Sequence, residues 1–194
     1  SPRMVAQAMI ASSETGTGVK ILGIDPEKEK MVTNLYTKIP DGQYFEGVKR
    51  NPILIGKKLA EKLKVKLHSK LVITLQDSQG HLTNEAFRVC GIYSIGNGMF
   101  EEMNVFVQKT DLARFVQLDE STTHELVVHL KDHEEMDANT ASLAGKYSGL
   151  LVQNWKQMTP ELGILNEYGN IYIYFFIGII LLSLGFGIVN TMLM

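Results

Sequence analysis

The stretch IYIYFFIGIILLSLGFGIVNTMLM, residues 171–194, decides how the rest of the chain is organised. These 24 residues carry no charge, and fourteen of them are Ile, Leu, Val or Phe. An α-helix needs about 20 apolar residues to cross a bilayer, and the summed insertion free energy of the fourteen, roughly −4 to −8 kcal/mol, outweighs the polar Asn190. The stretch therefore predicts a transmembrane helix. The alternative, a helix buried in a soluble core, would be unusually long and apolar on every face.

The same helix is expected to begin well before the bilayer. Thr159 and Pro160 form an N-cap and first-turn pair, and no strong breaker follows them. A helix from Thr159 would be about 54 Å long, of which about 18 Å would stand above the bilayer. We assign residues 158–170 to this stalk and residues 171–194 to the transmembrane helix, which the chain end truncates. The stalk residues expected to pack against the globular body are Leu162, Leu165 and Tyr168.

Small and polar side chains within the apolar stretch predict contact with another helix. Small residues let two helices approach closely, and a polar side chain in lipid favours a position inside a helix bundle. The predicted packing residues are Gly178, Ser183, Gly185, Gly187 and Asn190. A simple membrane anchor would need neither feature, so the sequence favours a bundle.

The remainder of the chain has the composition of a globular domain. The chain carries 19 basic and 21 acidic residues, a formal net charge of −2 and 45% apolar residues. This composition is too apolar for a disordered protein and too neutral for binding nucleic acid by phosphate neutralisation. The single Cys90 cannot form an internal disulfide and lies in an apolar run typical of a core. The chain begins without Met and ends inside the apolar stretch, so we expect a longer protein.

The body mixes strands and helices without strict alternation, which predicts an α+β fold. Strands are predicted from alternating or continuous apolar runs at residues 3–12, 18–25, 53–55, 71–75, 86–95, 103–107, 124–130 and 150–155. Helices are predicted from apolar spacing and caps at residues 57–67, 110–118 and 134–147, with a helical turn after Pro26 and tight turns at residues 77–80 and 97–98.

Two lobes are predicted within this body. Residues 1–35 and 109–157 would form a mixed α/β lobe, and the strand-rich residues 36–108 would be a β-rich lobe inserted into it. The flank at residues 157–170 contains acidic residues but no Lys or Arg, which favours the outer side of the membrane for the body.

Catalytic, cofactor-binding and metal-binding motifs are not recognised. The run GIYSIG, residues 91–96, has a glycine one place too early for a nucleophile elbow. The spacing of His124, His129 and His133 matches no zinc motif, and the acidic residues 132–137 lack the glycine of a calcium loop. We therefore expect a non-enzymatic protein without a cofactor, and any ATP hydrolysis would belong to a partner.

Five motifs, in their order and spacing, resemble the extracytoplasmic domain and second transmembrane helix of MacB/FtsX-type ABC transporter permeases. They are GIDP at 23–26, ILIGKKLAEKLKVKLHSKLVITLQDSQG at 53–80, FRVCGIY at 87–93, MNVFV at 103–107 and FGIVNTMLM at 186–194. The resemblance covers nearly the whole chain and is strongest to the LolC/LolE branch of lipoprotein-releasing permeases. In such permeases a mixed α/β lobe is interrupted by a β-rich lobe, as predicted above.

The resemblance implies mechanotransmission, in which a cytoplasmic ATPase dimer closes on ATP and the periplasmic domains of two permease copies move in response. It implies a bacterial inner (cytoplasmic) membrane location with the body in the periplasm. The implied partners are the ATPase dimer, a second identical or different permease copy, the lipid bilayer, and a periplasmic lipoprotein or accessory protein, but no nucleic acid. The sequence departs from the LolC type at residues 77–85, where a short turn replaces the long hook that receives a lipoprotein chaperone.

An extracellular sensing or binding domain on a membrane anchor is the alternative from another class. A permease needs further long apolar segments after Met194, whereas a sensor would continue into a soluble signalling module. A third hypothesis, a membrane-tethered hydrolase, lacks a catalytic constellation.

Overall fold

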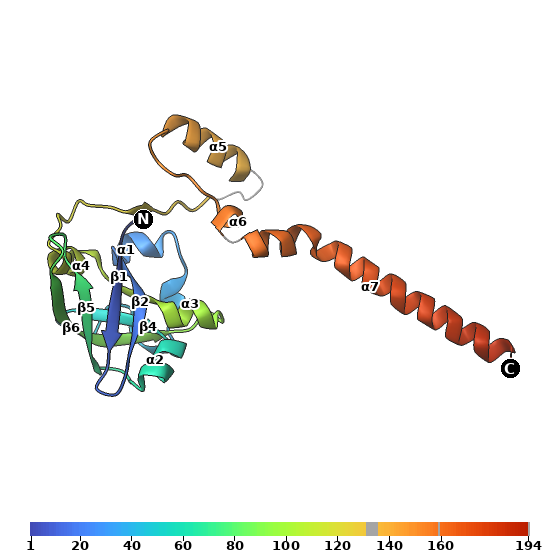
Figure 1. Cartoon of the computed structure of the whole chain (residues 1–194), viewed down its shortest axis with the longest axis horizontal. Coiled ribbons are helices and arrows are strands. Elements are labelled where there is room, and N and C mark those ends of the chain that lie inside the picture. Colours follow the sequence, from blue (N-terminus) through green and yellow to red (C-terminus); the bar gives the residue numbers. More distant parts are fainter. Residues whose placement is uncertain (131–135, 159, 194) are drawn as a thin grey trace. The chain divides into compact units, whose positions relative to one another are not determined.

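The computed structural model describes residues 1–130, 136–158 and 160–193, except for the side chains of residues 160–170. The chain forms two compact units, Ser1–His129 and Leu130–Met194. The first unit contains the sheet, and the second contains the long C-terminal helix (Figure 1).

A long hairpin opens the first unit. Strands β1 (Pro2–Ala11) and β2 (Gly16–Ile24) pair antiparallel along nearly their full length, from Arg3 opposite Ile24 to Ala11 opposite Gly16. The Ser12 hydroxyl closes the connecting turn, because its oxygen accepts hydrogen bonds from the backbone N–H groups of Glu14 and Thr15. Such side-chain acceptors are typical of Ser in turns. The hairpin predicted from the sequence is confirmed.

The strands of this unit form one sheet. Its other members are β3 (Asp41–Gly42), β4 (Pro52–Gly56), β5 (Lys70–Gln76), β6 (Leu82–Tyr93), β7 (Asn104–Gln108) and β8 (Glu125–Leu126). The order is β2-β7-β4-β6-β5-β1-β8, with β3 attached to β6, and β1 also pairs with β2. Hydrogen bonding therefore runs in a closed circuit through β1, β2, β7, β4, β6 and β5. Pairs β2–β7 and β4–β6 are parallel, and the other pairs are antiparallel.

Both faces of the central strands are buried. In β4, Ile53 and Ile55 face one apolar cluster and Leu54 faces a second, as strand geometry requires. Helices α2 (Lys57–Leu63) and α4 (Lys109–Val116) contribute buried side chains to the first cluster. Burying one such side chain stabilises the fold by about 1.5–3 kcal/mol. This explains why residues 53–55 are a continuous apolar run.

The second cluster is covered by short helices. The 3-10 helix Leu35–Thr37 supplies Leu35, and α3 (Gly98–Met103) packs Phe100 against the cluster. Helix α1 (Pro26–Lys30) follows β2 in the chain. Asp25 caps α1, because its carboxylate accepts from the backbone N–H groups of Glu27 and Lys28. The helical turn predicted after Pro26 is confirmed.

The second unit contains α5 (Met136–Lys146), α6 (Trp155–Met158) and α7 (Pro160–Leu193). Asn154 links the first two of these helices. Its side-chain N–H donates to Asp137 Oδ1 at 2.9 Å, and its Oδ1 accepts from the Gln157 backbone N–H at 3.0 Å. The predicted N-cap Thr159 lies outside the described residues.

Several predicted elements differ from the structure. The turn predicted at residues 97–98 begins α3, and the helix predicted over 57–67 ends at Leu63 because Lys64 adopts a left-handed φ of 53°. The strand predicted over 124–130 is reduced to β8. The strand predicted over 150–155 is absent, and Leu151 is 85% exposed, so within the described residues it has no sheet against which to pack.

The predicted α+β class is confirmed by the mixed sheet and its helices. The division into lobes at residues 36 and 108 stays a prediction. In the structure, β1 and β2 pair with β5 and β7, so one sheet contains strands from both predicted lobes, and the compact units divide after His129.

Candidate functional site

The C-terminal helix α7 is the first feature with functional potential. It is described as a continuous α-helix of 34 residues, about 51 Å long at 1.5 Å per residue. Its segment Ile171–Leu193 has a mean hydropathy of 2.3 and none of it is buried, so its length and composition allow it to cross a membrane. The side chains of residues 160–170 lie outside the described part, so the packing predicted for Leu162, Leu165 and Tyr168 is not described.

The predicted packing residues of α7 lie on two faces. Successive helical residues are rotated by about 100°, which places Ser183, Gly187 and Asn190 together and Gly178 with Gly185 on the opposite face. A Cβ atom added at any of these three glycines would meet no atom within 4 Å. The helix could therefore accept a neighbour closely on either face.

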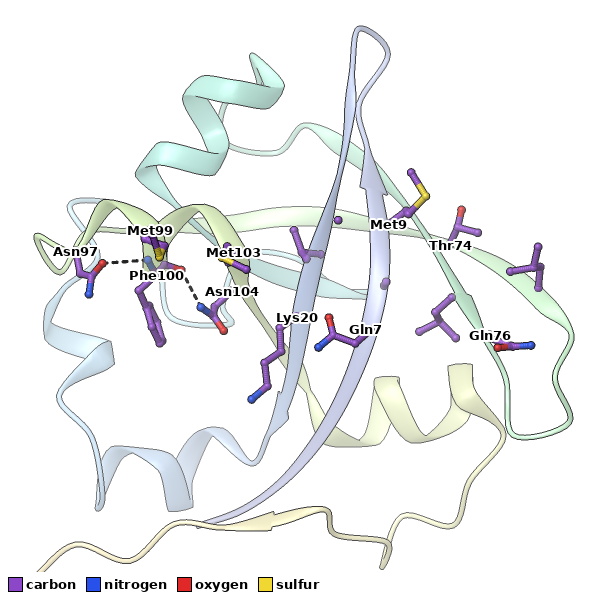
Figure 2. Close-up of a pocket in the computed structure, with 15 residues that line it drawn as sticks. Gln7, Met9, Lys20, Thr74, Gln76, Asn97, Met99, Phe100, Met103 and Asn104 are labelled. Atoms are coloured by element: carbon purple, nitrogen blue, oxygen red, sulfur yellow. Dashed lines mark hydrogen bonds between the residues drawn. The ribbon is translucent and has the colours of Figure 1, made fainter. Parts of the chain in front are cut away.

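An apolar groove of about 970 Å³ lies on the first unit (Figure 2). Strands β1, β2 and β5, the start of β6, and α3 with the residues beside it line it. On its floor Gln7 lies opposite Lys20 and Met9 lies opposite Gly18, where the missing side chain leaves open space.

Three exposed methionine side chains contribute to the groove. Met9, Met99 and Met103 line it and are 60%, 74% and 54% exposed. Methionine is flexible and polarisable and adapts to differently shaped apolar partners. The only charged residue in the lining, Lys20, forms an ion pair with Glu125 at 3.2 Å. The arrangement therefore favours an uncharged, apolar group.

The amide side chains at the α3 wall are engaged within the protein. Asn97 caps α3, since its Oδ1 accepts from the Phe100 backbone N–H at 3.1 Å, and the Asn104 side-chain N–H donates to the Phe100 carbonyl at 3.0 Å. Figure 2 shows both bonds at one end of the groove. They fix the position of α3, and with it the exposed methionines.

Buried Glu101 joins α3, which forms this wall, to the residues that follow β6. Its carboxylate accepts from the Ile95 N–H at 2.7 Å, the Ser94 hydroxyl at 3.0 Å and the Gly96 N–H at 3.1 Å. Burial opposes ionisation, but these hydrogen bonds outweigh it and lower the pKa of Glu101. Ser94 therefore has a structural role, in agreement with the interpretation of GIYSIG as a strand end.

Other titratable groups considered from the sequence are separated. His124 Nδ1 accepts from the Val5 backbone N–H at 3.0 Å, His129 lies five residues further along the chain, and His133 lies outside the described residues. Burial raises the pKa of the Cys90 thiol to about 11. In the part of the chain that the structure describes, no group of three His, Cys, Asp or Glu residues could hold a metal ion.

Sequence reasoning missed the groove. Its available signal was the pair Met99 and Met103, one helical turn apart, but only the structure shows that they are exposed and line the same groove as Met9. The predicted packing residues in α7 are not part of the groove lining.

Comparisons with known proteins concern mainly the first unit. A family model described as the MacB-like periplasmic core domain matches residues 1–146. None of the curated proteins matches the chain. Among solved structures, the extracellular domain of the noncanonic ABC-type transporter YknZ from Gram-positive bacteria is similar, with a TM-score of 0.49 and 18% sequence identity. The match covers 78% of this chain and 76% of that one.

Proposed function

Because the chain belongs to the family of MacB-like periplasmic core domains, we propose that it is the extracytoplasmic domain and one transmembrane helix of an ABC transporter permease. Its place would be the bacterial inner membrane, with the first unit in the periplasm. ATP hydrolysis would occur in a cytoplasmic ATPase dimer, and a second permease copy, identical or different, would complete the transporter.

One observation supports mechanotransmission above all others. Helix α7 continues from Pro160, above the apolar segment, to Leu193 within it. Each turn of an α-helix is held by backbone hydrogen bonds, so a displacement of the membrane segment is passed along the axis instead of being absorbed by a loop. The proposed stalk, residues 158–170, would carry ATP-driven movement to the periplasmic domain, with Leu162, Leu165 and Tyr168 packing against it.

The cargo is proposed at the level of its class. We propose release of a lipoprotein or export of another periplasmic substrate, in line with the predicted similarity to the LolC/LolE branch. The β5–β6 connection is short: Asp77 Oδ1 accepts from the Gln79 and His81 N–H groups, each at 2.9 Å. The tip also docks on α4, since the Ser78 N–H donates to the Val116 carbonyl. Transfer to a lipoprotein chaperone through a long hook is therefore not part of the proposal.

A length-matched pair of variants tests the coupling. In the complete transporter, Ile164, Asn166 and Glu167 are replaced by three glycines or by three alanines, which leaves Leu162, Leu165 and Tyr168 in place. Each glycine weakens the helix by about 1 kcal/mol relative to alanine, so only the first variant gains a hinge. We expect the glycine variant to lose transport while the alanine variant keeps it, with both assembling with the ATPase. Equal activity of the two variants would contradict coupling through a rigid helix.

The open apolar groove favours a second candidate function, an extracellular domain that senses or binds an apolar ligand on a membrane anchor. The two functions differ in their dependence on ATP. If hydrolysis by a copurified ATPase depends on this subunit, the permease is supported. If no ATPase copurifies and the chain continues into a soluble signalling module, the sensor is supported instead.

A further inference from the structure

Strand β8 is a weakly attached element at an important place in the chain. It pairs with β1 at two positions, Pro2 opposite Leu126 and Arg3 opposite Glu125, and Ser1 and Val127 exchange two further hydrogen bonds at 2.7 and 2.9 Å. It is also the last strand before the first unit ends at His129, after which the chain continues to the unit that contains α7. A group that strengthens or weakens these contacts therefore changes how firmly the end of the first unit is held to β1.

His124 adds two hydrogen bonds to this short ladder. Its backbone N–H donates to the Arg3 carbonyl at 3.0 Å, and its Nδ1 accepts from the Val5 backbone N–H at 3.0 Å. The side chain thus occupies an acceptor position that a neighbouring strand would otherwise fill. Acceptance requires a free lone pair on Nδ1, so the imidazole must be neutral and carry its hydrogen on Nε2.

Protonation reverses the role of this side chain. An imidazolium donates from both nitrogens, so an Nδ1–H group would face the Val5 N–H and the hydrogen bond would be lost. Imidazole is the side chain that ordinarily changes charge between about pH 5 and 8. His124 is exposed, so a proton can reach it from solvent.

The charged groups on the surrounding elements already have partners. Arg3 of β1 is paired with Glu29 of α1, and Lys20 of β2 is paired with Glu125 of β8. Lys109 of α4 donates to the Thr123 hydroxyl at 3.0 Å, next to His124 in the sequence. The Ser1 amino group of the same chain segment donates to the Val127 carbonyl at 2.7 Å, so it too has a partner.

We propose that His124 makes the β8 attachment pH-dependent: β8 has its full set of hydrogen bonds while the imidazole is neutral and loses the bond from Val5 as the pH falls. Loss of this bond weakens the hold of β1 on the residues that follow Thr123, which lead to the end of the first unit at His129. This local release does not depend on the proposed transport function. Its consequence, weaker coupling of the periplasmic domain to the membrane helix in acid, does rest on that function.

The test measures amide exchange in the complete 194-residue chain in detergent micelles. Nuclear magnetic resonance follows the protection of the Val5 amide, corrected for the intrinsic pH dependence of exchange. Loss of one hydrogen bond is expected to reduce protection about fivefold to tenfold between about pH 7.5 and 5.5. In His124→Asn, Oδ1 can accept near the position of Nδ1 at both pH values, so protection should stay constant. The matched control, His129→Asn, should behave as the wild type.

A second measurement covers the case in which asparagine fails to accept the bond. The imidazole nitrogen chemical shifts of His124 should show hydrogen on Nε2 alone at about pH 7.5, changing to both nitrogens as Val5 loses protection. Three results would each overturn the proposal. The first is constant Val5 protection in the wild type, and the second is a wild-type pH response in a His124→Asn variant that retains the bond. The third is hydrogen on Nδ1 at the higher pH. Transport assays would show separately whether release affects coupling.

Discussion

Glu29 shows how much one buried charge can matter at the scale of a residue. It is 1% exposed and accepts hydrogen bonds from the Arg3 guanidinium and, at 3.0 Å, from the Thr33 hydroxyl. Burial by itself disfavours its charged form, but the hydrogen bonds and the positive charge of Arg3 outweigh this effect and lower the pKa of Glu29. The ion pair joins β1 to α1.

Replacing Glu29 by glutamine should reduce the free energy of unfolding by about 2–4 kcal/mol at neutral pH, because the Arg3 charge is left partly buried without its partner. Since the folded-state pKa is lowered, this stabilisation is fully present above the ordinary glutamate pKa and is lost as the pH falls through the lower folded-state pKa. Urea unfolding followed by circular dichroism should show the two proteins converging in acid. Glu27→Gln, at an exposed ion pair in the same helix, should change stability by about 0.5 kcal/mol or less.

Gly56 is a second position where a single added atom, a Cβ, would change the stability of the fold. A Cβ atom there would lie 2.1 Å from the Glu101 carbonyl oxygen and 2.5 Å from its Cα, so backbone would have to move. Gly56→Ala should destabilise the protein by about 1–3 kcal/mol. Gly18→Ala is the matched control, because its Cβ meets no atom within 4 Å, and its effect should be about 0.5 kcal/mol or less. Thermal unfolding of both variants measures the difference, and equal effects would contradict the close contact.

At the scale of elements, the two faces of α7 make separate predictions. We expect Gly187→Leu to weaken association with a neighbouring helix about tenfold, because the added side chain prevents close approach while the helix stays apolar. Gly185→Leu makes the same chemical change on the opposite face and should leave that association intact. Crosslinking yield in membranes measures association. If both variants lose it equally, packing through the Ser183, Gly187 and Asn190 face is wrong.

The elements also show where sequence reasoning works and where it fails. Residues 53–55 were predicted as a strand because burial on both faces leaves a continuous apolar run. Asn97-Gly98 was assigned to a turn because the same side chain that begins a turn also caps a helix, and here Asn97 caps α3. Leu150 and Leu151 have the composition of a strand, but strand preference depends on packing against a sheet, and both are mostly exposed.

At the scale of the whole molecule, the pairing of distant strands was the feature least predictable from the sequence. The α+β class and the family follow from local patterns and motif order. The closed circuit depends on register between distant segments, such as Ile21 beside Val105 and Ile53 opposite Val107, which no local pattern specifies. The Met-rich groove and the contact of His124 with Val5 follow from that register, so they became visible only in three dimensions.

The short pairing of β8 also has a mechanical consequence. Tension applied to the chain beyond His129 reaches the β1 segment first through the hydrogen bonds between Ser1 and Val127 and then through the two rungs of β8, while β1 itself is held along its length by β2. Pulling from the membrane end should therefore peel β8 away before the rest of the sheet yields. Under the proposed coupling to the membrane, this strand would yield first and leave the rest of the sheet folded.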